Sequence, residues 1–89
     1  MSLGVMDTIW KIDGPMLKVS AAGKFRSGEK VIFYSEVGGE PIATGMIAEI
    51  NTGTDTITLD DVPDGAVTVG DHIYMNRQDE SKIHLVHSR

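Results

Sequence analysis

Residues 42–60 read IATGMIAEINTGTDTITLD, and this stretch decides the fold class. Its last part, Thr56–Asp60, alternates strictly, so the isoleucine and leucine are expected to face a core and the threonines solvent. Asn51–Asp55 has the composition of a hairpin loop, in which its glycine is available for a positive φ. Ile42–Ile50 is a longer apolar strand, and Gly45 within it indicates a bulge or sharp bend. We therefore expect two antiparallel strands joined by a tight loop.

Similar strand patterns recur on both sides of this stretch, and no segment shows a sustained helical periodicity. The β-branched and aromatic run at Lys30–Ser35 is the clearest of them. Turns are expected at Val37–Pro41 and at Pro63–Gly65. Further strands are expected at Met16–Ala21, Asp71–Asn76 and Ile83–His87. Five or six short antiparallel strands at this spacing predict an all-β fold, a small and partly open β-barrel.

The chain has 89 residues, which is the size of one domain. Residues 16–89 are expected to form the barrel, with residues 1–15 as an N-terminal arm or a first strand. Trp10 and Ile12 either pack on the barrel or form an arm that packs on a neighbour. A single tryptophan near a terminus is more often a plug for its own core. There is no cysteine, no apolar run long enough to cross a bilayer and no signal-peptide pattern, so we expect no contact with a membrane.

Charge is distributed unevenly along the chain. Five basic and three acidic residues give residues 1–35 a net charge of +2, whereas ten acids against one arginine give residues 36–80 a net charge of −9. The favoured interpretation is that the acids occupy turns and keep the domain soluble. The alternative is one basic and one acidic face suited to a head-to-tail contact. Nucleic acid is an unlikely partner, because most of the chain would repel phosphate.

No motif for catalysis, metal binding or cofactor binding is present. His84 and His87 are three residues apart, which on a strand places them on opposite faces. The acids Asp60, Asp61 and Asp64 lack the alternating oxygens and closing glutamate of a calcium loop. No cysteine, nucleophile motif or phosphate loop occurs. We therefore expect no catalytic residues, no metal, no cofactor and no enzymatic activity.

Three segments together resemble a small β module of structural proteins in tailed bacteriophages, including parts of some major capsid proteins. They are Ala43–Asn51, Thr56–Asp60 and Val69–Tyr74, within a stretch from Ile42 to Tyr74. The resemblance implies a non-enzymatic structural or assembly component of a phage or prophage virion, found in the virion or the host cytoplasm. Its implied partners are other virion proteins or further copies of itself, with a homo-oligomer as one possibility.

Two charged stretches are the candidate contact residues. The basic one comprises Lys24, Phe25, Arg26 and Lys30, and the acidic one comprises Asp55, Asp60, Asp61 and Asp64. A second functional hypothesis is a nucleic-acid- or ribosome-associated barrel, with Phe25 as an exposed stacking platform between two cations. The competing interpretation places Phe25 in the core with its charged neighbours in water.

Overall fold

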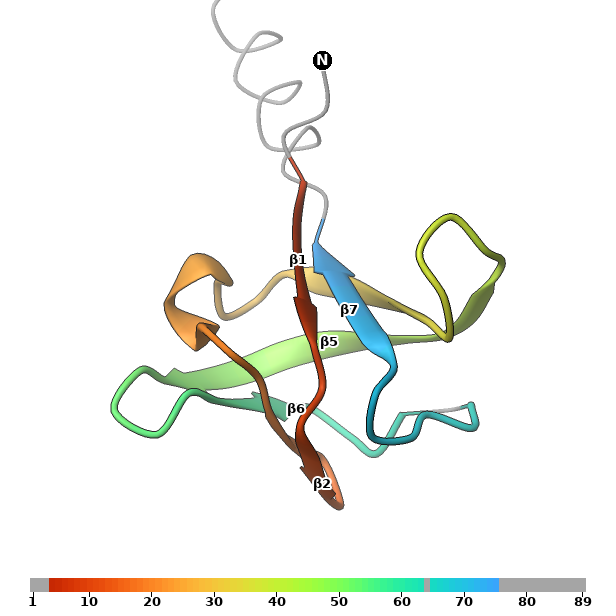
Figure 1. Ribbon diagram of the computed structural model, residues 1–89. Coiled ribbons are helices and arrows are strands. Elements are labelled where there is room, and N and C mark those ends of the chain that lie inside the picture. The colour runs from red at the N-terminus through yellow and green to blue at the C-terminus, as the bar shows by residue number, and fades with distance from the viewer. Residues whose placement is uncertain (1–3, 64, 76–89) are drawn as a thin grey trace, which may run out of the picture.

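The computed structural model describes residues 4–63 and 65–75, and it is all-β (Figure 1). One 3-10 turn, η1 (Ala22–Lys24), interrupts the strands. The strands are β1 (Val5–Thr8), β2 (Lys11–Asp13), β3 (Met16–Lys18), β4 (Lys30–Tyr34), β5 (Pro41–Asn51), β6 (Thr56–Leu59) and β7 (His72–Met75). Every pairing among them is antiparallel. The predicted all-β antiparallel fold is confirmed.

The described strands form one sheet in the order β1-β7-β4-β5-β6-β3-β2, which is not closed into a barrel. Its two edge strands, β1 and β2, are consecutive in the chain and are separated only by Ile9 and Trp10. Ile9 still belongs to the β7 end of the sheet, where its N–H donates to the carbonyl of Asp71, the residue before β7, at 2.9 Å. The Trp10 N–H instead donates to the Lys18 carbonyl on β3 at 2.7 Å. The chain therefore changes from one end of the sheet to the other within two residues.

Strand β5 connects the two halves of the sheet, since it pairs with both β4 and β6. Its register against β6 shifts at Ala48, because Ile47 pairs with Leu59 whereas Glu49 pairs with the preceding residue of β6. The prediction of a bulge at Gly45 is therefore wrong by three residues. Gly45 pairs regularly with Val31, and a Cβ there would lie 3.3 Å from Leu59 Cδ1, so glycine permits close packing at this position.

The core lies on one face of the sheet and draws on almost every strand. Ile57 and Leu59 are buried, which confirms the alternation predicted for β6. Ile73 and Met75 of β7 are buried in the same way. The other buried apolar residues are Ile9, Leu17, Val19, Ala22, Phe25, Val31, Phe33, Ala43 and Ile47. Burial of this apolar surface is the dominant stabilising contribution in a domain without disulfides.

The N-terminal residues belong to the sheet, which raises the number of described strands to seven instead of five or six. A two-residue turn, Gly14-Pro15, joins β2 to β3, and Asp13 pairs with Met16 across it. Gly14 has a φ of 60°, and a proline follows it, as expected at the central positions of a type II′ hairpin turn. Residues 5–13 are thus two short strands and not an arm.

Four further expectations differ from the structure or lie outside the described residues. Trp10 is not a core plug, since 63% of its surface is exposed. In the β5–β6 loop the positive φ of 52° belongs to Asp55, whereas Gly53 bonds through its N–H to Asn51 Oδ1. The predicted strand at 83–87 and Asp64 of the predicted turn lie outside the described residues.

Candidate interaction surface

The basic stretch does not form an aromatic platform. Phe25 is buried at 4% exposure and belongs to the core, so its assignment as a contact residue is wrong. Its neighbour Lys24 lies with its Nζ 3.5 Å from Asp7 Oδ2. Lys30 opens β4, where it is exposed and pairs with Met46 on β5. Without an exposed ring between the cations, this stretch lacks the stacking surface of a single-strand-binding barrel.

Asp7 on β1 is a buried carboxylate that sequence reasoning missed. It accepts backbone N–H groups from Thr8 at 2.6 Å, Ser20 at 3.0 Å and Ala21 at 2.8 Å. Burial alone would raise the pKa of the Asp7 carboxyl, but these three N–H groups and the Lys24 ammonium outweigh it, so its pKa lies below the usual 3.8. Asp7 therefore fixes β1 to the segment that leads into η1. This network stabilises the fold.

The acidic stretch is divided between structural and exposed positions. Asp55 accepts the Ala22 N–H on Oδ1 at 3.1 Å and the Val19 N–H on its main-chain oxygen at 2.9 Å. It therefore lies against the segment that precedes the basic stretch. Asp60 and Asp61 are exposed, and Asp61 Oδ1 accepts the N–H of the next residue at 2.8 Å. Asp64, the fourth candidate, is outside the described residues.

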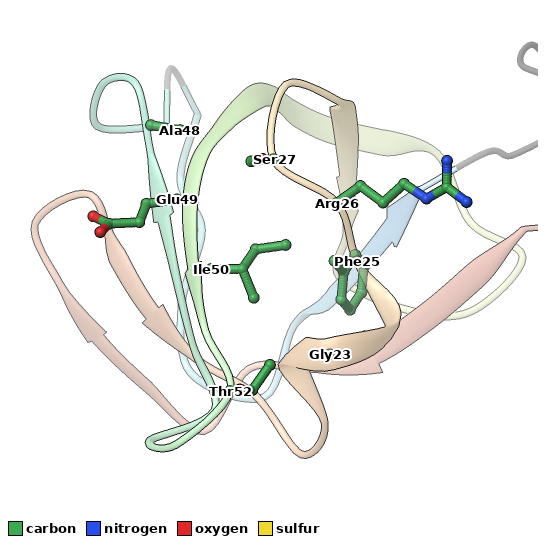
Figure 2. A pocket seen from close by; sticks show the side chains of 8 residues that line it. All are labelled: Gly23, Phe25, Arg26, Ser27, Ala48, Glu49, Ile50 and Thr52. Carbon is green, nitrogen blue, oxygen red and sulfur yellow. The ribbon is translucent and has the colours of Figure 1, made fainter.

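A hollow between η1 and β5 has a volume of about 610 Å³ (Figure 2). It is lined by Gly23, Phe25, Arg26, Ser27, Ala48, Glu49, Ile50 and Thr52. Figure 2 shows Ile50 between its walls, while the charged ends of Arg26 and Glu49 point away in opposite directions. A small-molecule site usually brings polar groups together within an apolar cavity. This open hollow does not have that arrangement.

The described residues contain no group of three histidine, cysteine, aspartate or glutamate side chains that could hold a metal ion. What they do present is exposed apolar surface. The large apolar side chains that are exposed are Met6, Trp10, Met16, Val37, Met46, Val62 and Val69. Trp10 is held in place, because its indole N–H donates to Ser20 Oγ at 2.8 Å. An oriented and exposed indole ring is typical of an anchor in a protein–protein interface.

A second, smaller hollow of about 190 Å³ lies beside β2, on the outer face of the β2–β3 hairpin. Its lining consists of Lys11, Asp13, Met16, Lys18, Thr54 and Thr56, which we call the β2 surface. Lys11 and Lys18 are directly opposite each other across the β2–β3 ladder. Like charges in that position are unfavourable unless an acid lies nearby. The β2 surface is therefore suited to an acidic side chain approaching from beyond β2.

The described part of the chain has no helix with the length and apolar character needed to cross a membrane. A scan against protein-family models found no matching family. A search of curated proteins likewise found no matching relative.

Proposed function

We propose that this chain is a non-enzymatic structural module of a phage or prophage virion that acts through protein–protein contacts. The single observation that carries the proposal is the exposed Trp10 ring, oriented by its bond to Ser20. Burying an aromatic side chain contributes strongly to association, and tryptophan is enriched among the residues that dominate interface energies. The resemblance of residues 42–74 to phage structural modules supports the choice of a virion as the assembly.

Purified particles provide a direct test. Prophages would be induced in the strain that carries the gene, and particles would be purified on a density gradient and analysed by mass spectrometry. We expect the chain to band with the particles. Recovery of the chain only in the fractions of free protein would overturn the proposal.

Variants identify the surface responsible. Trp10→Ser is expected to lower incorporation into particles by about tenfold, because it removes the aromatic anchor. Val37→Ser is the matched control, since it removes a similarly exposed apolar side chain from the turn between β4 and β5. Equal incorporation of both variants and the wild type would show that Trp10 is not the anchor. Circular dichroism of each variant establishes that it folds.

A further inference from the structure

The outer edge of β2 has a defined set of backbone groups. On either side of β3, the Pro15 carbonyl and the Val19 N–H bond toward β6, so Met16 and Lys18 direct their backbone groups toward β2. Because bonding directions alternate along an antiparallel strand, Lys11 and Asp13 direct their backbone groups at β3. The N–H and carbonyl of Ile12 between them point the other way. Among the described strands, β2 pairs only with β3, so Ile12 faces an edge open to another strand.

We propose that β2 pairs antiparallel with β2 of a second copy of this chain, about a two-fold axis at Ile12. This inference names the partner for the assembly role proposed above and rests on that role only for its biological setting. The two Ile12 residues form a hydrogen-bonded pair, in which each N–H donates to the carbonyl of the other. Figure 1 shows β2 at the lower extremity of the fold. The result is one sheet that continues through both copies.

In this register, the charged side chains of one β2 strand are complementary to those of the β2 strand in the second copy. Antiparallel pairing about Ile12 places Lys11 opposite Asp13 of the second copy and, by symmetry, Asp13 opposite Lys11. Both side chains are exposed and line the β2 surface. The arriving carboxylate lies next to Lys11, which already faces Lys18 across the ladder. The contact therefore places a carboxylate directly opposite Lys11, in addition to the Asp13 of the same copy that lines this surface.

This self-complementarity distinguishes β2 from a strand that is protected against pairing. Edge strands often carry lysine so that a second edge meets like charge. An Ile12 flanked by lysine on both sides would repel its own copy. Lysine on one side and aspartate on the other attracts it instead.

The central residue of the proposed pair also fits. Ile12 packs against the core from its own copy and gains the other Ile12 as a neighbour.

Charge exchange tests the register. Sedimentation velocity would be measured from roughly 5 µM to 1 mM, the range in which weak dimers dissociate. Asp13→Lys and Lys11→Asp should each weaken dimerisation at least about tenfold, because each places like charges opposite one another. The double variant Lys11→Asp with Asp13→Lys should restore it. Glu40→Lys makes the same charge change as Asp13→Lys at an exposed position outside β2, and should leave dimerisation unchanged.

Cross-linking provides a second measurement that does not depend on charge. The chain has no cysteine, so a mixture of Lys11→Cys and Asp13→Cys chains places a single thiol on each side of the proposed pair. Oxidation should cross-link the mixture faster than either variant alone, because opposite residues at a non-hydrogen-bonded position are close enough for a disulfide.

Two results of the sedimentation measurements would refute the inference. One is a wild type that stays monomeric at every concentration, and the other is a double variant that stays monomeric when the wild type dimerises. Incorporation of a strictly monomeric chain into particles would refute this dimer alone, whereas a dimer absent from particles would refute only the virion role.

Discussion

The carboxylate of Asp7 accepts the backbone N–H of Ala21 at 2.8 Å, and this bond joins edge strand β1 to the segment before η1. The same carboxylate accepts two further N–H groups and lies 3.5 Å from the Lys24 ammonium. Replacing Asp7 with alanine leaves three donors unsatisfied in a buried site. We expect Asp7→Ala to lower the free energy of unfolding by about 2–4 kcal/mol, measured by urea denaturation. Glu40→Gln, an exposed change, should alter it by less than about 0.5 kcal/mol.

The lowered pKa of Asp7 predicts how stability depends on pH. A carboxyl whose pKa is lower in the folded state stabilises the protein above its ordinary value of 3.8, and this contribution is lost as the pH falls through the folded-state pKa. The stability difference between wild type and Asp7→Asn should therefore be largest near neutral pH and shrink below pH 3.8. Urea midpoints between pH 7 and pH 2.5 measure it. A difference that grows as the pH falls would contradict the assignment.

Replacing Gly14 in the Gly14-Pro15 turn should lower stability through backbone strain alone, without a steric clash. At a φ of 60° an added Cβ at Gly14 meets no atom within 4 Å, so Gly14→Ala introduces only conformational strain. We expect a loss of about 1–2 kcal/mol. Gly23→Ala is the control, since Gly23 has no positive φ and its Cβ would make an ordinary contact with Thr52. Thermal unfolding of both variants should show the larger decrease for Gly14→Ala.

Asp55 provides a test between structural and contact roles for the acidic stretch. Asp55→Asn keeps an oxygen for the Ala22 N–H and tolerates the φ of 52°, so its stability should stay within about 1 kcal/mol of wild type. Asp55→Ala loses both properties and should cost about 2–3 kcal/mol. If Asp55→Asn abolishes incorporation into particles while remaining folded, the negative charge itself makes a contact.

Because Trp10 is exposed and Phe33 is buried, replacing each with alanine should lower the free energy of unfolding by unequal amounts. Trp10→Ala removes an exposed ring and one hydrogen bond, and should lower stability by about 1 kcal/mol or less. Phe33→Ala removes a fully buried ring and should cost about 3–5 kcal/mol. Urea denaturation compares the two directly. A similar loss for both variants would mean that the indole ring is part of the core in solution.

The strands were predictable where the sequence itself alternates. Thr56–Asp60 and Lys30–Ser35 predict β6 and β4 within one residue of their observed ends. Strand β3 lies within the strand predicted at Met16–Ala21, but β2 and the Gly14-Pro15 turn were missed, because β2 has only three residues and shows little alternation.

The roles of Asp7 and Trp10 could not be predicted from their sequence neighbours. Asp7 depends on N–H groups that lie 13 and 14 residues further along the chain. The exposure of Trp10 depends on the change of pairing partner between Ile9 and Trp10, which is a property of the whole sheet. Both features arise from tertiary structure, which local periodicity does not encode.

The origin of both sheet edges in one N-terminal segment also determines when the domain can finish folding. Val5 pairs with Met75, so β1 has no strand to join until the ribosome has synthesised β7. At about 5–20 residues per second, the first strand waits several seconds for its partner. The hairpin of β5 and β6 has all its residues much earlier. The sheet is thus completed only after β7 has been synthesised, beginning with local hairpins and ending with the pairing of the first described strand to the last described one.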